Sequence, residues 1–417
     1  MTFYCRLDTT GIQDIIIQRC IKEQNKASRF CGSSETMDEK WNGVDFYRRL
    51  CFPFYCERRW PMRFETIKYI EWAKTRPGVE IDLCSSSVDQ LKRKDLDLDW
   101  GTLEVSGENS YGYPPLLEAI AERYGVEDNN VVSAIGTSHA LFLVCAALIG
   151  PGDEVLIESP VYEPLLALPV AFDARVRRLE RKYANSYQFT LDEFETAITP
   201  HTKFILLTNL HNPSGALLSR SFLARMVRSA QQKNIFVVID EIYLEFTKEE
   251  PTAFHLADNV IVISSLTKVF GLANLRCGWV LAQPRLAERM RRIVDYTNVE
   301  GTFVGEAIAH RMFIHLDTIK EQNRELVNTN KSLVKELIDR EDRLSWVEPA
   351  GGVVCFPRVE SGMNGDELAE CLRDRYGTAV VPGRFFEKPE HFRLGFGGDT
   401  NTLEAGLTKI RKALRES

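Results

Sequence analysis

The sequence predicts an α/β fold in which a large domain, built on a mainly parallel sheet between helices, is joined to a smaller α+β domain. The first observation is the length, because 417 residues exceed what one ordinary compact core accommodates. The second is a series of short apolar runs that alternate with helical segments between residues 154 and 282. The third is a change of pattern after residue 301, where the chain becomes more helical and more charged.

Three helices and a short strand are predicted ahead of the apolar runs. Periodic or continuous apolar positions predict helices over residues 64–76, 113–124 and 139–149. Pro114 stands at the start of the second helix, where a missing N–H costs nothing. Residues 81–85 have the composition of a short strand.

The apolar runs themselves are short and nearly continuous, as is typical of strands that are buried on both faces. The runs cover residues 154–157, 204–208, 235–239, 260–264 and 278–282. A helical segment, residues 221–233, lies between two of them. Strands that alternate with helices imply a mainly parallel sheet covered on both sides.

The C-terminal part predicts a second domain of mixed structure. It is interrupted at Gly351–Gly352 and contains a short strand at residues 392–396. The predicted division of the chain is an N-terminal extension of unknown role (1–60), the first part of the small domain (61–110), the large domain (111–300) and the rest of the small domain (301–417).

The composition argues against a nucleic-acid or membrane partner. The formal net charge of −7 offers no basic surface to nucleic acid or anionic lipid. No apolar stretch approaches the ~18 residues of a membrane span, and the run Ile15–Ile17 is too short for the core of a signal peptide. The apolar share of 44% and the charged share of 27% are typical of soluble globular proteins, so we expect a cytoplasmic protein.

The cysteines do not predict a metal site. There are ten, of which five fall in the first 56 residues. None forms a CxxC pair, and no histidine stands at metal-ligand spacing from any of them. In the absence of a secretory signal, free thiols are favoured over a disulfide framework.

Polar residues follow the apolar runs, at the edge of a doubly wound sheet where ligands bind. Lys268 follows the run 260–264, and an unpaired charge at such a position is costly, which favours a depressed pKa or covalent use of the amine. Arg276 and the hydroxyls of Ser265 and Thr267 would supply a cation and phosphate ligands nearby. A lysine after a strand is, by itself, more often a surface residue.

Two other runs are also followed by polar side chains. Asp240 follows the run that ends at residue 239; a carboxylate there needs a cation or hydrogen-bond donors, or it caps the next helix. The tetrapeptide Asn212–Gly215 follows the run that ends at residue 208 and is, taken alone, typical of a turn. The spacing is regular, with 28 residues from Asn212 to Asp240 and 28 more to Lys268.

In order and spacing, these motifs resemble those of the class I/II aminotransferases, which belong to the aspartate-aminotransferase superfamily of enzymes that use pyridoxal 5'-phosphate (PLP). The motifs are Asn212–Gly215, Asp240 with Tyr243, and Ser265–Lys268 with Arg276. The resemblance extends from about residue 61 to the C-terminus. It implies a PLP-dependent transferase-like fold with a mainly parallel seven-stranded sheet.

The resemblance also implies a role for each matching residue. Lys268 is similar to the lysine that holds PLP as a Schiff base and that moves a proton between the substrate Cα and the cofactor C4′. Asp240 matches the partner of the pyridinium nitrogen, which keeps the ring an electron sink. Tyr243 and Asn212 match donors to the phenolic oxygen of the cofactor, and Asn212 also matches a substrate-binding position.

Further matches surround the phosphate and the ring of the cofactor. N–H groups at a helix N-terminus attract anions, although Thr and Ser at such a place are by themselves more typical of a plain N-cap. The implied phosphate ligands are Gly136, Thr137, Ser138, Ser265 and Arg276. Tyr162 matches the aromatic residue that stacks on the pyridine ring.

The substrate end shows one match and two uncertain features. Arg393 resembles the arginine that clamps the substrate α-carboxylate, for which a planar guanidinium is suited. Serines at 85–87 stand where the family usually has glycine near this carboxylate, so the pocket there is narrower or carries an added hydroxyl. The loop 109–114 matches one that sends a tyrosine to the phosphate of the neighbouring subunit; we favour Tyr111 over Tyr113.

The resemblance therefore implies an aminotransferase that moves an amino group between an α-amino acid and a 2-oxo acid by a ping-pong mechanism through Lys268, most often as a homodimer. One alternative is a PLP-dependent β-lyase or related synthase on the same scaffold. Another is a non-catalytic sensor or regulator, whose DNA-binding head would have to lie in residues 1–60, although these lack a basic recognition helix. The substrate is not predicted, because resemblance of fold does not transfer specificity.

Overall fold

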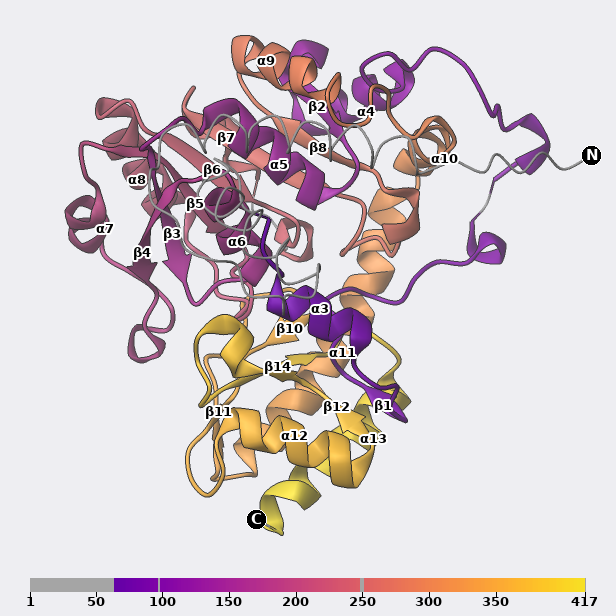
Figure 1. Cartoon of the computed structure of the whole chain (residues 1–417). Helices are drawn as coiled ribbons and strands as arrows, with labels where there is room; N and C mark the ends of the chain where they lie inside the picture. The colour runs from indigo at the N-terminus through magenta and orange to yellow at the C-terminus, as the bar shows by residue number, and fades with distance from the viewer. Residues whose placement is uncertain (1–63, 97, 248–250, 417) are drawn as a thin grey trace, which may run out of the picture. The chain divides into compact units, whose positions relative to one another are not determined.

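The computed structural model describes residues 64–96, 98–247 and 251–416 (Figure 1). The predicted N-terminal extension, with its five cysteines, lies outside the described residues. From Pro61 onward the chain forms one compact unit. The predicted division of this unit at residues 110 and 300 stays a prediction.

A seven-stranded sheet forms the centre of this unit. Its strand order is β2-β8-β7-β6-β5-β3-β4. Only β8 is antiparallel to its neighbours, and every other adjacent pair is parallel. The strands are β2 (Val131–Ala134), β3 (Glu154–Ser159), β4 (Arg175–Glu180), β5 (Thr202–Thr208), β6 (Phe236–Asp240), β7 (Val260–Ser265) and β8 (Gly278–Leu281). The predicted mainly parallel α/β sheet is confirmed.

The two edge strands, β2 and β4, were not predicted from the apolar runs. Strand β4 contains only one buried residue, Leu179, because its outer edge and much of its surface meet solvent. A strand of this kind carries charged side chains instead of a continuous apolar run. The five strands that were predicted are β3 and β5 to β8, which occupy the interior of the sheet.

Helices cover both faces of the sheet (Figure 1). On one face, Val238 of β6 packs in a cluster with residues of α5 (Thr137–Leu148), α6 (Glu163–Ala171) and α9 (Pro284–Val294). On the other face, Val237 and Ile239 pack with residues of the remaining helices of this part of the chain. These helices are α4 (Pro114–Tyr124), α7 (Leu191–Ala197), α8 (Arg220–Gln232), α10 (Phe303–Phe313) and α11 (Leu316–Asp339). Alternate residues of a strand thus fill two cores, as the pleat requires.

Helix α3 (Lys68–Thr75) is shorter than the predicted helix over 64–76, which was wrong in its first turn. The backbone N–H groups of Lys68 and Tyr69 donate to the carboxylate of Glu163 at the start of α6. Free N–H groups at a helix start need acceptors. A carboxylate distant in sequence therefore determines where α3 begins, which a local pattern does not show.

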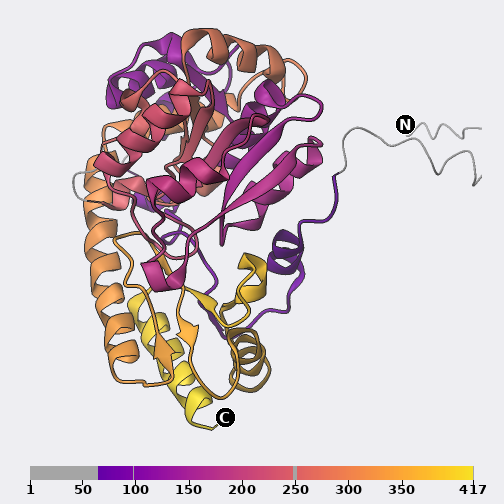
Figure 2. The ribbon, with the colours of Figure 1, turned by 90° about the vertical axis from the view of Figure 1, so that its left-hand side faces the viewer.

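The C-terminal elements form small sheets covered by α12 (Gly365–Tyr376) and α13 (Thr400–Arg415). Strand β1 (Ile81–Asp82) pairs in parallel with β12 (Thr378–Ala379), so the segment after α3 contacts these elements. The other strands are β9 (Leu344–Ser345), β10 (Val354–Cys355), β11 (Arg358–Val359), β13 (Val381–Pro382) and β14 (Phe392–Gly395), in the orders β11-β9 and β10-β14-β13. Figure 2 shows α11 running from the sheet-bearing part to these elements.

Two features are absent among the described residues. No helix in this part of the chain is both long and apolar enough to cross a bilayer. Among the same residues, no group of three or more His, Cys, Asp or Glu side chains is placed to hold a metal ion.

Candidate active site

A cavity of about 490 Å³ lies at the carboxyl ends of β5, β6 and β7, where the sequence placed its polar motifs. This volume falls within the roughly 300–1,000 Å³ typical of small-molecule sites. Its polar lining consists of Lys74, Ser86, Thr137, Ser138, Tyr162, Thr208, Asn212, Asp240, Tyr243, Thr267, Lys268 and Arg276. Motifs separated by 28 residues along the chain therefore meet at one place, the edge of the sheet where the strands end.

Lys268 lies just beyond the end of β7, and its ammonium group reaches into the cavity. Its Nζ donates to Ser86 Oγ at 3.0 Å. Burial lowers the pKa of this amine to about 8, and the positive charges of Arg393 and Arg276 act in the same direction. Asp240 opposes the shift. The site therefore provides an amine that is partly uncharged near neutral pH, as nucleophilic or proton-accepting use requires.

Asp240 is the last residue of β6 and borders the same cavity. Its Oδ1 accepts a hydrogen bond from the backbone N–H of Ile242 at 3.0 Å. Burial raises the pKa of this carboxyl to about 7, and the neighbouring carboxylate of Glu158 adds to the rise. A carboxyl with so high a pKa is short of positive charge, so a cationic ring nitrogen bound here would favour its ionised form.

The opposite end of the cavity is suited to an anion. Thr137 and Ser138 open helix α5, whose N-terminal N–H groups carry partial positive charge. Arg276 also borders this end, and it donates to the carbonyl oxygens of Ala273 and Ile135. Gly136 has φ +77°, and a Cβ there would stand 2.5 Å from Arg276 Nη2. Glycine at this position thus lets the guanidinium approach the helix start.

The hydroxyls of Ser265, the last residue of β7, and of Thr267, just beyond it, have different positions. Ser265 is buried, accepts from Thr137 Oγ1 at 3.1 Å and donates to Thr267 Oγ1 at 2.8 Å. Thr137 and Thr267 border the cavity directly. Ser265 therefore orients the two threonines, and Thr267 is better placed than Ser265 to contact a phosphate.

Tyr243 and Tyr162 also border the cavity, as the sequence predicted. The Tyr243 hydroxyl donates to the backbone oxygen of Ser86 at 2.9 Å. Ser86 thus accepts from both Tyr243 and Lys268, through its backbone and its side chain respectively. The serine that departs from the expected glycine contributes a hydroxyl to the site, one of the two consequences considered above.

Arg393, on β14, is fully buried and reaches the cavity through Asn212. Its Nη1 donates to Asn212 Oδ1 at 3.3 Å. Its Nη2 donates to the Tyr69 hydroxyl at 2.8 Å and to the backbone oxygen of Cys84 at 3.1 Å. Its Nε has no partner among the described residues. Three hydrogen bonds thus hold the guanidinium, and its Nε–H group remains able to donate to a ligand.

A buried ion pair holds the backbone of Asn212 in place through Thr208. Arg181 Nη1 lies 2.8 Å from Glu158 Oε2, and both side chains are fully buried. Glu158 Oε1 accepts from the N–H and hydroxyl of Thr208, whose Oγ1 in turn accepts from the N–H of Asn212 at 3.0 Å. This network was not predicted from the sequence. The signal was available, since Glu158 continues an apolar run where an unpaired charge would be costly.

Tyr111 does not border the cavity of its own chain. Its hydroxyl accepts from Arg292 Nη1 at 2.6 Å, and the guanidinium carbon of Arg292 lies 4.7 Å from the ring centroid. Tyr113 packs edge-on against Phe303, with ring centroids 5.4 Å apart. The prediction that Tyr111 reaches the phosphate of a neighbouring subunit stays a prediction.

These features together fit PLP. One cavity is lined by an anion cup (Thr137, Ser138 and Arg276), by the Asp240 carboxyl and by the Lys268 amine with its lowered pKa. These are the groups needed for the phosphate, the ring nitrogen and the aldehyde of that cofactor, respectively. The phosphate would be held by Thr137, Ser138, Thr267 and Arg276. The ring nitrogen would face Asp240.

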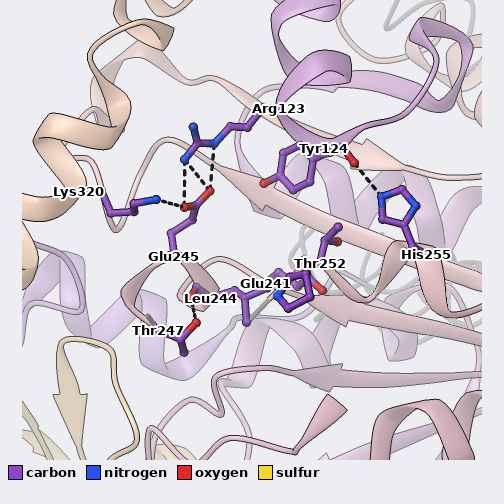
Figure 3. A pocket seen from close by; sticks show the side chains of 10 residues that line it. Arg123, Tyr124, Glu241, Leu244, Glu245, Thr247, Thr252, His255 and Lys320 are labelled. Carbon is purple, nitrogen blue, oxygen red and sulfur yellow. Dashed lines mark hydrogen bonds and ion pairs between the residues drawn. The ribbon is translucent and has the colours of Figure 1, made fainter. Parts of the chain in front are cut away.

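A second cavity, of about 470 Å³, lies beside η5 (Leu244–Phe246), beyond the end of β6 (Figure 3). Its cationic groups are already paired: Arg123 Nη2 and Lys320 Nζ lie 3.0 and 3.3 Å from the carboxylate of Glu245. Glu241 is buried in its wall, with Oε1 accepting from Ala253 N–H at 2.7 Å. Because Arg123 and Lys320 are paired with Glu245, the described residues of this cavity offer neither an uncharged amine nor an unpaired cation for a phosphate, unlike those of the first cavity.

Glu241→Gln is expected to stabilise the protein at alkaline pH but not at acid pH. Burial raises the pKa of Glu241 to about 7, so the folded state prefers the protonated carboxyl. The unfolded chain ionises first, and stability is lost as pH rises between about 4.5 and 7. Denaturation experiments at pH 5 and pH 8 give the free energy of unfolding of both proteins. The difference between variant and parent should be about 2–4 kcal/mol more favourable to the variant at pH 8 than at pH 5. An equal difference at both pH values would mean that Glu241 does not titrate as inferred.

Comparison with known proteins gives one consistent result. The family model described as "Aminotransferase class I and II" matches residues 84–410. An aspartate aminotransferase of Thermotoga maritima is 28% identical over 326 residues, which cover 75% of this chain and 84% of that enzyme. A capreomycidine synthase of Streptomyces vinaceus is 29% identical over 310 residues, covering 73% of this chain and 80% of the synthase.

A solved structure agrees with the sequence comparisons. The structure of a PLP-dependent aminotransferase from Streptococcus suis superimposes with a TM-score of 0.78 at 26% sequence identity. The match covers 85% of this chain and 99% of that one.

Proposed function

The chain belongs to the class I and II aminotransferase family and is a PLP-dependent aminotransferase, and we propose that its catalysis depends on Lys268, Asp240 and Arg393. The observation that carries this proposal is the cavity in which the Lys268 amine and the Asp240 carboxyl, with pKa values displaced towards neutrality, face an anion cup. Displaced pKa values in a cleft are typical of catalytic groups. PLP, when bound, supplies the electron sink and carries the amino group between the two substrates.

Each of the chain's own residues then has a defined task. Lys268 Nζ, uncharged when its proton is lost, accepts the proton from the Cα of the amino acid. Asp240 holds positive charge on the ring nitrogen, since its carboxylate is otherwise destabilised by burial. Arg393 binds the α-carboxylate and Asn212 orients the guanidinium. The amino acid and the 2-oxo acid use this site in turn, which gives ping-pong kinetics.

A synthase or β-lyase on the same scaffold is the second candidate, and the likeness to a capreomycidine synthase favours retaining it. Both activities begin with the same proton transfer to Lys268. They differ in which bond breaks next, and this depends on how the substrate side chain is held. An arginine that retains the α-carboxylate disfavours decarboxylation in either case.

A substrate panel separates these candidates. The purified enzyme with PLP is incubated with single amino acids, with and without 2-oxoglutarate or pyruvate, and the oxo acids and ammonia are measured. We expect stoichiometric exchange of an amino group, with parallel lines in double-reciprocal plots. Ammonia release without an acceptor would identify a lyase. Absence of both, with PLP bound, would contradict the proposed activity.

A homodimer and a cytoplasmic location are parts of the same proposal. Support for the dimer comes from side chains that are apolar and exposed in the single chain, among them Tyr296 (90% exposed) and Ile314 (83%). Tyr111, held by Arg292 at the surface, would then meet the partner's cavity. The location is inferred from the composition of the sequence.

A further inference from the structure

The guanidinium of Arg393 is partly occupied by the protein itself. Of its five N–H groups, one from Nη1 and two from Nη2 are directed at Asn212, Tyr69 and Cys84. The carbonyl of Cys84 is part of the backbone, whereas the Tyr69 hydroxyl is at the end of a side chain on the short helix α3. A carboxylate that grips both Nη atoms must therefore share Nη2 with Tyr69 or displace its hydroxyl.

The position of Tyr69 suggests sharing. Its ring is 7% exposed and meets the rings of Tyr162 and Phe385 edge-on, with centroids 5.4 and 5.8 Å apart. These contacts aim the hydroxyl at Arg393. The hydroxyl accepts a hydrogen bond from Arg393 and donates to no acceptor recorded among the described residues. Its own proton is thus available to an anion that arrives beside the guanidinium.

The cavity comes close to this group through two neighbouring side chains. Asn212, which accepts from Arg393, and Tyr162, whose ring centroid lies 5.4 Å from that of Tyr69, both border the cavity. Arg393 itself is fully buried behind Asn212 and Tyr69. A carboxylate that binds Nη2 of Arg393 therefore meets the Tyr69 hydroxyl, which already accepts from this atom.

We infer that the Tyr69 hydroxyl is a second α-carboxylate-binding group, which donates to one carboxylate oxygen while Arg393 donates to both. This inference rests on the proposed function of Arg393. A carboxylate can accept up to about four hydrogen bonds, so the two donors do not compete for its lone pairs. The sequence offered no signal for this residue, which lies 324 positions from Arg393.

The test compares Tyr69→Phe with the parent enzyme, both loaded with PLP. Two probes are titrated by visible absorbance: the best amino acid from the substrate panel, and the amine that has the same side chain but lacks the carboxylate. Phenylalanine keeps the ring contacts and removes only the hydroxyl. We expect the amino acid to bind about 10- to 100-fold more weakly, as for the loss of a hydrogen bond to a charged group, and the amine to bind unchanged.

Tyr183→Phe is the matched control, since the Tyr183 hydroxyl donates to Ser345 Oγ at 2.6 Å and Tyr183 does not border the cavity. It should leave both dissociation constants unchanged. Equal weakening of amino acid and amine by Tyr69→Phe would indicate a structural role and overturn the inference. Tighter binding of the amino acid would show that the hydroxyl only obstructs Arg393, and would also overturn it. If the parent enzyme transfers no amino group at all, the proposed function fails first.

Discussion

Lys268→Ala is expected to abolish transamination and the visible absorbance band of the Schiff base between Lys268 and PLP. Alanine removes the amine that, in the proposal, both holds the cofactor and accepts the Cα proton. Loss of the proton transfer alone costs about 10²- to 10⁴-fold in rate, and loss of the attachment adds to this. Turnover and absorbance spectra of the purified variant, measured after incubation with PLP and removal of the unbound cofactor, check the expectation.

Lys74→Ala provides the matched control. Lys74 borders the same cavity from α3 but is exposed to solvent. It should retain the spectrum and most of the activity. A Lys268→Ala enzyme that keeps the visible band, or a Lys74→Ala enzyme that loses it, would show that the amine has been assigned to the wrong residue.

Asp240→Asn is expected to lower kcat by about 10²- to 10³-fold, the usual effect of removing one preorganised electrostatic partner. Asparagine has nearly the same shape and can still accept from the N–H of Ile242, as Asp240 Oδ1 does at 3.0 Å. It cannot carry the negative charge that keeps a ring nitrogen protonated. The loss should therefore appear in kcat more than in the binding of PLP.

Glu241→Gln is the control for this variant, because the neighbouring carboxyl lies in the wall of the second cavity (Figure 3). Both carboxyls have pKa values raised to about 7 by burial, yet only Asp240 borders the candidate active site. We expect unchanged kcat in Glu241→Gln. Similar losses in the two variants would mean that Asp240 acts through stability and not through charge at the ring.

Local patterns were sufficient for the interior of the fold. Strands β5, β6 and β7 are buried on both faces, so their apolar runs could be recognised within one or two residues of their ends. Strand β4 could not, because an edge strand with exposed arginines has no such run. The start of α3 depends on Glu163, about 95 residues away, and is equally invisible to a local pattern.

In the candidate site, too, some residues could be predicted from local patterns and others could not. Lys268, Asp240 and Asn212 follow neighbouring strands, so the topology of a parallel sheet brings them together and their convergence could be predicted. Ser86 and Tyr69 reach the site through contacts across 182 and 324 positions. Ser86 could be recognised only as one of three serines in place of glycine, and Tyr69 lies in no motif that carries chemistry. Ser265 has a motif position but is buried behind two threonines, a distinction that only the side-chain geometry reveals.

Identification of the lysine that carries PLP tests the proposal most directly. The loaded enzyme is treated with borohydride, which makes the attachment permanent, and is then digested and mapped by mass spectrometry. We expect the added mass on the peptide containing Lys268 and on no other. The same mass on Lys74, or on any lysine outside the cavity, would contradict the site described for this enzyme.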